Sequence, residues 1–108
     1  MAGDPGQTPE QESEVLTAER QETKKPPLYK VLLHNDDFTT MEFVVFVLKT
    51  VFHKNRLDAE RIMIAVHQQG IGVAGVFSYE IAEAKINKVT SLARAQDFPL
   101  LCTMEEDV

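Results

Sequence analysis

The sequence has a single cysteine, Cys102, no tryptophan and no long apolar run. One cysteine has no intramolecular disulfide partner and cannot build a cysteine-based zinc site by itself, so we expect a protein of the reducing cytoplasm. No segment approaches the roughly 18 apolar residues that a membrane-spanning helix needs. The opening residues, MAGDPGQTPEQ, lack the basic and apolar parts of a secretory signal, and we expect no such signal.

Positive charge is also scarce. The chain has 11 Lys and Arg against 17 Asp and Glu, for a net charge of −6. An acidic chain without a basic cluster is poorly suited to phosphate backbones or anionic lipid, so we expect neither nucleic acid nor membrane as a partner. With 44% hydrophobic and 26% charged residues, the composition is that of a globular protein, and 108 residues suffice for one domain.

The composition divides the chain at Pro26-Pro27. Residues 1–25 have no aromatic side chain, and their only large apolar residues are Met1, Val15 and Leu16. Such a segment buries too little apolar surface to offset its ordering entropy. We therefore predict a disordered extension over residues 1–25 and a folded domain over residues 26–108.

Six elements are predicted in this domain. Strand-favouring residues at 28–34 are followed by an apolar run at 41–52, whose β-branched content favours a strand but whose length and i, i+3, i+4 spacing favour a helix. A second helix at 57–69 ends at Gly70, a strand covers 72–77, and a third helix, capped by Ser78, fades near Gln96. A last strand covers 99–104. The order β-α-α-β-α-β predicts a small α+β sandwich, with a three-stranded antiparallel sheet packed against three helices. The inner face of the third helix is expected to consist of Ile81, Ala82, Ile86, Val89 and Ala93.

The turn Asn35-Asp36-Asp37 brings two carboxylates and an amide between a strand and a helix. One interpretation is structural, because such side chains cap helices and close turns. The other is a cation site, since converging carboxylate and amide oxygens suit an ammonium group or a hard metal ion. The turn lacks the spacing of a 12-residue calcium loop, so we expect no metal.

Two histidines allow an alternative with catalytic chemistry. His34, Asp36 and His67 form a conceivable metal-dependent hydrolase site, although no histidine pair has helical ligand spacing. His67 at the rim of an apolar stripe is more typical of a structural residue, and Cys102 within an apolar strand is typical of a buried hydrophobe. No nucleophile elbow or phosphate-binding loop is present, so we expect neither an enzyme nor a cofactor. Met41 and Met63 could line an adaptable apolar cavity.

Four collinear blocks of the sequence together resemble the ClpS family, the adaptors of the bacterial N-end rule that deliver substrates to a Clp AAA+ unfoldase. These blocks are KPPLYKVLLHNDDFTTMEFVVFVL, AERIMIAVHQQG, GVFSYEIAEAK and PLLCTME, between about Lys25 and Glu105. ClpS proteins resemble in fold the C-terminal domain of the bacterial ribosomal stalk, so a purely structural interaction domain remains an alternative, because fold alone does not fix function.

The resemblance implies a binding module that holds the first residue of a substrate when this is Leu, Phe, Tyr or Trp. By position, the contacts to the free α-amino group fall on Asn35, Asp36 and His67. The surface that docks on the N-terminal domain of a ClpA-type unfoldase includes Glu80 and Lys85, and residues 1–25 are the part that the unfoldase engages. We expect a monomeric adaptor. The implied hydrophobic pocket is formed by Thr39, Met41, Val44, Met63, Val66 and Leu100.

Some positions depart from the family pattern. Phe38 stands where Tyr is common, and Thr40 stands where Pro is common, which leaves the loop before Met41 less stiff. Ala74 replaces a frequent cysteine, and Phe46 is a bulky apolar residue on a helix face expected to be exposed. The loop change predicts a narrower or shifted preference for the first residue.

Overall fold

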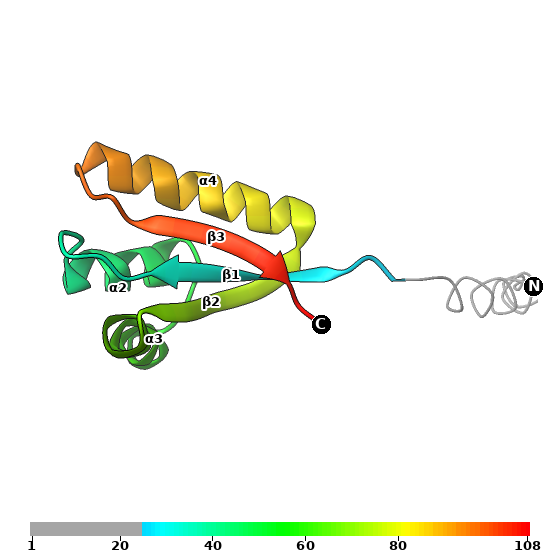
Figure 1. Cartoon of the computed structure of the whole chain (residues 1–108), viewed down its shortest axis with the longest axis horizontal. Coiled ribbons are helices and arrows are strands. Elements are labelled where there is room, and N and C mark those ends of the chain that lie inside the picture. Colours follow the sequence, from blue (N-terminus) through cyan, green and yellow to red (C-terminus); the bar gives the residue numbers. More distant parts are fainter. Residues whose placement is uncertain (1–24) are drawn as a thin grey trace, which may run out of the picture.

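The computed structural model describes residues 25–108, so the predicted extension at residues 1–25 lies, apart from Lys25, outside the described residues. Six elements follow one another as β1 (Leu28–His34), α2 (Met41–Thr50), α3 (Arg56–Gln69), β2 (Ile71–Ser78), α4 (Tyr79–Ala95) and β3 (Leu101–Glu106). The strands form one antiparallel sheet in the order β2-β1-β3 (Figure 1). The predicted α+β class and the β-α-α-β-α-β order are confirmed.

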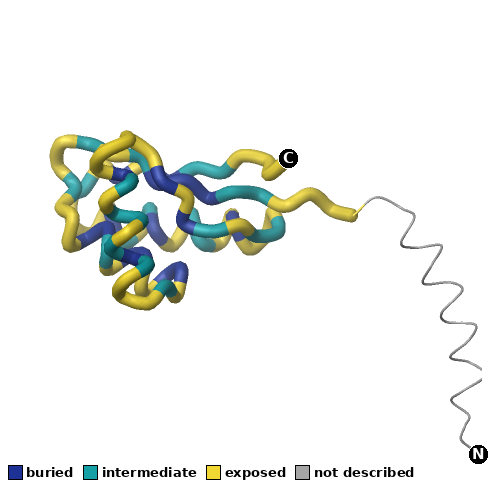
Figure 2. The backbone as a smooth tube through the Cα atoms, turned by 90° about the horizontal axis from the view of Figure 1, so that it is seen from below, coloured by how far each residue is buried: buried dark blue, intermediate teal, exposed yellow. Residues whose placement is uncertain are grey.

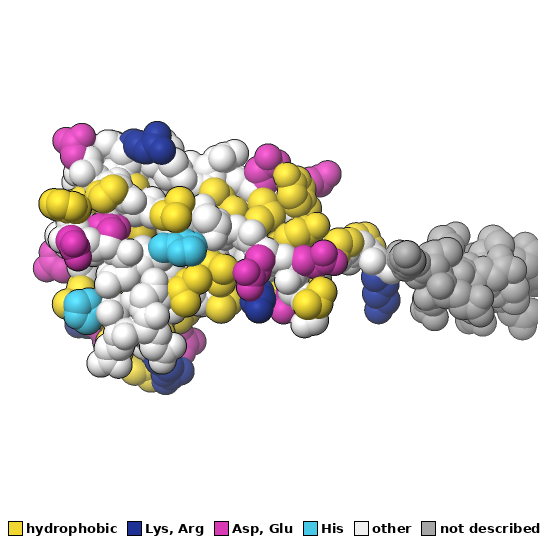
Figure 3. Space-filling model, viewed as in Figure 1, with side chains coloured by type: hydrophobic (Ala, Val, Ile, Leu, Met, Phe, Trp, Pro, Cys, Tyr) yellow, Lys and Arg dark blue, Asp and Glu magenta, His cyan; other side chains and the backbone are white. Residues whose placement is uncertain are grey.

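The central strand β1 supplies the middle of the core. Val31 and Leu33 are fully buried, and they pack with apolar residues from all three helices. Figure 2 colours the backbone by burial, with buried residues in dark blue. Along β2 buried and exposed residues alternate, as expected where helices cover one face of a sheet and solvent meets the other. The exposed face shows a scatter of apolar side chains (Figure 3), among them Ile71, Val73 and Leu101.

The run at 41–52 is a helix, as its length predicted, but the helix ends at Thr50 and not at Phe52. Val51 is its C-cap, and both Val51 and Phe52 are buried beyond the helix end. Val51 and Phe52 are apolar because they pack in the core beyond the end of the helix. The spacing of apolar residues alone does not distinguish such positions from the last turn of a helix.

Other boundaries moved for identifiable reasons. The last strand covers residues 101–106 and not 99–104, because its ladder with β1 continues until Glu106 pairs with Tyr29. Ser78 occupies the N-cap position of α4, but its side chain makes no capping hydrogen bond. Ile81, predicted to face inward, is 51% exposed. The inner face of α4 instead follows the spacing of its buried or packed residues, Ala82, Ile86, Val89 and Ala93.

Two glycines govern how closely segments approach one another around β2. Gly70 ends α3 with φ of 89°, a left-handed conformation that glycine adopts without steric cost, as the sequence predicted. Gly72 lies so close to α3 that a Cβ atom there would stand 2.7 Å from Cγ2 of Val66. A side chain at position 72 would therefore push β2 and α3 apart.

Candidate functional site

The candidate site begins with the loop between β1 and α2. The backbone amide of Asn35 donates to the carbonyl oxygen of Gly70 at 2.9 Å, which ties the loop to the end of α3. At the other end of the loop, Thr40 is the N-cap of α2, and its hydroxyl oxygen accepts a hydrogen bond from the Phe43 amide at 3.1 Å. The loop is therefore tied at one end to the C-cap of α3 and at the other end to the first turn of α2.

The Asp36 carboxylate organises the interior of this loop. Oδ1 accepts hydrogen bonds from the amides of Phe38 and Thr39 at 2.8 and 2.7 Å, and Oδ2 accepts one from the Thr39 hydroxyl at 2.7 Å. Burial raises the pKa of Asp36, but these bonds from Thr39 and Phe38 favour the ionised form and together hold the pKa below its ordinary value of 3.8. The idea that Asn35, Asp36 or Asp37 caps the helix is wrong, because the cap is Thr40.

Helix α3 supplies the opposite wall through three side chains in its last two turns: Met63, Val66 and His67. Val66 is 2% exposed and His67 is exposed, so the wall changes from apolar to polar over one residue. The close approach that Gly72 permits sets the depth at which Val66 packs.

Loop and helix together enclose a cavity of about 380 Å³. Its lining includes the polar residues Asn35, Asp36, Asp37 and His67. It also includes the apolar residues Met41, Val44, Met63 and Val66. A cavity that places negative charge and oxygen acceptors beside an apolar wall suits a ligand with an ammonium group next to a large apolar side chain.

Most of the residues that the resemblance assigned lie together in this cavity. Its lining includes Asn35, Asp36 and His67 and also five of the six expected pocket residues, namely Thr39, Met41, Val44, Met63 and Val66. The exception is Leu100, which is 6% exposed in the core and does not line the cavity. Leu100 was assigned through the resemblance alone, and its place in the pocket stays a prediction.

The assignment from the resemblance did not include three of the lining residues: Asp37, Phe38 and Thr40. Phe38 is 73% exposed at this loop, an unusual position for a large aromatic side chain. A signal was available, because all three lie in the short loop between assigned residues, and a loop closed around Asp36 turns most of its side chains toward one space.

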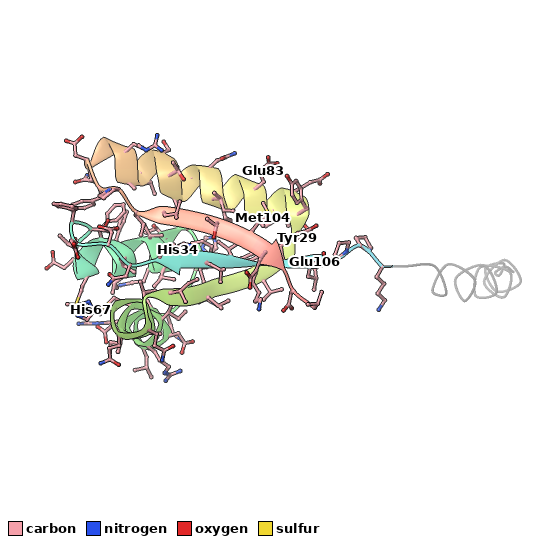
Figure 4. All side chains as sticks on the ribbon, in the orientation of Figure 1. Tyr29, His34, His67, Glu83, Met104 and Glu106 are labelled. Atoms are coloured by element: carbon pink, nitrogen blue, oxygen red, sulfur yellow. The ribbon has the colours of Figure 1, made fainter. Side chains whose placement is uncertain are left out.

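The alternative metal site is not assembled. His34 is the last residue of the central strand β1, whereas His67 lies on α3 (Figure 4). Nε2 of His34 is 2.8 Å from the Thr103 hydroxyl. Within residues 25–108 no group of three potential metal ligands comes together. Cys102 is buried, and burial raises the pKa of its thiol to about 12, as expected for a structural cysteine. None of the helices in the same range has the length and apolar character of a membrane span.

Comparisons with known proteins show the family to which the chain belongs. Residues 24–103 match the family model described as ATP-dependent Clp protease adaptor protein ClpS. The chain belongs to the ClpS family. A ClpS adapter protein from Caulobacter sp. (strain K31) is 56% identical over 95 residues, covering 88% of this chain and 87% of the relative. A ClpS adapter protein from Myxococcus xanthus (strain DK1622) is 55% identical over 100 residues, covering 91% and 94% of the two chains.

A solved structure is similar in fold as well. It is the structure of Agrobacterium tumefaciens ClpS2 bound to L-phenylalaninamide, with a TM-score of 0.74 and 42% sequence identity. The match covers 77% of this chain and all of the ClpS2 chain. As a member of the ClpS family, the protein is an adaptor of the Clp protease and not an enzyme.

Two residues that the ClpS resemblance assigned to unfoldase docking lie on α4 and differ in exposure. Glu80 is exposed in the first turn. Lys85 is half-buried: its Nζ donates to the carbonyl oxygen of Val51 at 2.8 Å and lies 5.2 Å from the ring centroid of Phe77. Lys85 therefore also connects α4 to the end of α2 within the domain.

Proposed function

We propose that this ClpS-family adaptor binds the first residue of a substrate protein, with its free α-amino group at Asn35, Asp36 and His67 and its side chain against the apolar wall. Leu, Phe, Tyr and Trp are the first residues expected to bind. The observation that supports the proposal is the cavity itself, which acidic and apolar residues line together. The ClpS2 relative was solved with phenylalaninamide, a molecule that has an amino group next to an aromatic side chain.

The hydrogen bonds of Asp36 leave room for an ammonium group. A carboxylate has about four lone-pair sites, two on each oxygen. Phe38 and Thr39 amides occupy Oδ1, whereas Oδ2 receives only the Thr39 hydroxyl. One site on Oδ2 is thus left for a donor from the ligand, and the lowered pKa keeps the carboxylate charged at neutral pH.

Recognition then depends on two contributions acting together. An α-amino group has a pKa of about 7.7–8.0 and is mostly charged at neutral pH. Charge-assisted hydrogen bonds contribute about 1.5–3 kcal/mol each, and full burial of a Leu or Phe side chain contributes about 1.5–3 kcal/mol. Since association itself costs at least several kcal/mol, neither contribution suffices alone. The unbranched Met41 and Met63 can adjust to aliphatic and aromatic first residues.

The test is a binding panel measured by fluorescence anisotropy. A peptide that begins with Phe is expected to bind, while the same peptide with an acetylated amine, or with Phe moved inward, is not. Asp36→Ala is expected to weaken binding by about 2–5 kcal/mol, as for removal of a buried charge partner. Glu83→Ala is the control, because it removes one negative charge from an exposed position of α4. Equal binding of free and acetylated peptides would refute the assignment.

Delivery is the second half of the proposal. Docking on the N-terminal domain of a ClpA-type unfoldase would use the α4 surface with Glu80. Residues 1–25, of which residues 1–24 lie outside the described range, would be engaged by the unfoldase. The protein would act as a monomer in the cytoplasm. Glu80→Lys is the sharper docking variant, because Lys85→Ala also removes the hydrogen bond to Val51. In a pull-down with the unfoldase domain, the Glu80→Lys protein should no longer be retained. Its affinity for the substrate peptide should be unchanged.

A further inference from the structure

A second apolar groove adjoins the candidate site. It has a volume of about 480 Å³ and lies between α2 and α3. Its apolar side chains are Met41 and Val45 from α2 and Met63 and Ile64 from α3. Met41 and Met63 also line the first cavity, so these two methionines form a shared wall between the two spaces.

The groove exposes apolar surface that the fold does not require. Met41 is 50% exposed and Ile64 is 47% exposed, although each lies on an otherwise amphipathic helix. Contiguous apolar side chains left open beside a binding cavity are typical of a surface that a ligand covers. The shared methionines would touch the first residue of the substrate. The following residues of the same substrate chain would therefore cover the groove.

The charged rim of the groove does not favour a charged occupant. Nε of Arg56 is paired with the Glu60 carboxylate at 3.1 Å. Glu42 and Lys49, the other two charged residues of the rim, are of opposite sign. The rim therefore has no net charge, and the apolar floor decides which side chain binds best.

An extended chain has the right repeat to use both spaces. Its side chains alternate between two sides, so residues one and three point the same way and lie about 6.4–6.8 Å apart. The two spaces adjoin, since Met41 and Met63 line both, so an extended chain that enters the first can pass over the second. Resting on the function proposed above, we propose that the groove is a second subsite, which takes an aliphatic side chain at the third position of the substrate.

The proposal is tested with two C-terminally labelled peptides, one beginning Phe-Gly-Leu and the other Phe-Gly-Ser, followed by the same polar sequence. The Leu peptide is expected to bind about three- to tenfold more tightly, as for partial burial of one aliphatic side chain. Ile64→Ser should remove this difference and leave the affinity of the Ser peptide unchanged, because Ile64 lines the groove and not the first cavity.

Two control variants define the specificity of this result. Ile81→Ser changes the same residue type at similar exposure on α4, and it should keep the preference for Leu. Phe46→Ser tests a rival path over Thr40, since Phe46 is also 47% exposed and lines a different cavity that shares only Thr40 with the site. A Leu preference that is lost in Phe46→Ser and kept in Ile64→Ser would overturn the proposal.

The outcome separates the subsite from the function on which it rests. If acetylation of the Phe amine abolishes binding but the Leu and Ser peptides bind equally, the first cavity works as proposed and the subsite is refuted. If acetylation has no effect on either peptide, the proposed function fails and the subsite fails with it.

Discussion

Thr39 donates to both oxygens of the Asp36 carboxylate, from its amide to Oδ1 and from its hydroxyl to Oδ2, each at 2.7 Å. The same carboxylate that would receive a ligand ammonium is thereby held in place by its neighbour three residues on. The orientation of Oδ2 depends on a hydroxyl, which a single substitution can remove without changing the size of the side chain.

Thr39→Val is therefore expected to weaken peptide binding. The substitution keeps the amide bond to Oδ1 but removes the hydroxyl bond to Oδ2, so the carboxylate is less well oriented and its pKa rises toward the ordinary value. A single hydrogen bond of this kind contributes about 0.5–1.5 kcal/mol, which predicts roughly a two- to tenfold loss of affinity by anisotropy. Thr39→Ser restores a hydroxyl and should recover most of the loss. If Val and Ser variants bind alike, the hydroxyl does not orient Asp36.

The lowered pKa of Asp36 also predicts how stability depends on pH. A carboxyl whose folded pKa lies below its unfolded value of about 3.8 stabilises the fold fully above that value and loses this contribution as the pH falls through the folded pKa. The difference in unfolding free energy between the native protein and Asp36→Asn should thus be constant from pH 7 to about pH 5 and should shrink below pH 3.8. Urea unfolding at each pH gives this difference. A difference that instead grows as the pH falls would contradict the direction of the shift.

The sequence singled out the loop that lines the cavity, but it predicted the edges of several elements less well. Asn35, Asp36 and Asp37 stand out because three turn-forming, oxygen-bearing residues follow one another, and the structure places all three at the cavity. Ile81 was misplaced because an apolar side chain next to a buried position gives the same local signal whether it faces inward or faces solvent. That difference is decided by how α4 and β3 pack, which local sequence does not contain.

The bond network around Asp36 was also beyond the sequence. Capping and loop closure use the same residue types, and the choice depends on the backbone path from residue 35 to residue 40. Here Thr40 takes the cap, which leaves Asp36 free to close the loop and to face the cavity. The proposed role of Asp36 in binding rests on this difference between the two residues.

Gly72 is expected to couple the fold to the site. In Gly72→Ala the new Cβ would stand 2.7 Å from Cγ2 of Val66 and 3.3 Å from the Ile62 carbonyl oxygen, so α3 must shift away from β2. Overpacking of this kind costs about 1–3 kcal/mol of unfolding free energy, and the shift of Val66 should weaken peptide binding. Urea unfolding measures the change in unfolding free energy, and fluorescence anisotropy measures the change in peptide affinity.

A double-mutant cycle identifies the contact responsible. Val66→Ala removes Cγ2, so the cost of Gly72→Ala should be smaller in the Val66→Ala background than in the native protein. Gly70→Ala is the control: nothing lies within 4 Å of its Cβ position, and its cost comes from φ of 89° alone. The cost of Gly70→Ala should be the same in both backgrounds. If the cost of Gly72→Ala were also unchanged, contact with Val66 would not be the cause.

Cys102 offers a direct measure of opening of the core. Its side chain is buried in β3, and burial raises the pKa of the thiol to about 12, so at pH 8 almost none of it is the reactive thiolate even apart from steric protection. Reaction with a chromogenic disulfide reagent should therefore be slow in buffer and fast in urea, with a midpoint that follows unfolding. Replacing exposed Ser91 by Cys in a Cys102→Ala background gives the matched control, which should react rapidly in both solutions. Rapid labelling of Cys102 in buffer, at the rate of the Ser91→Cys control, would mean that β3 separates from β1 without global unfolding.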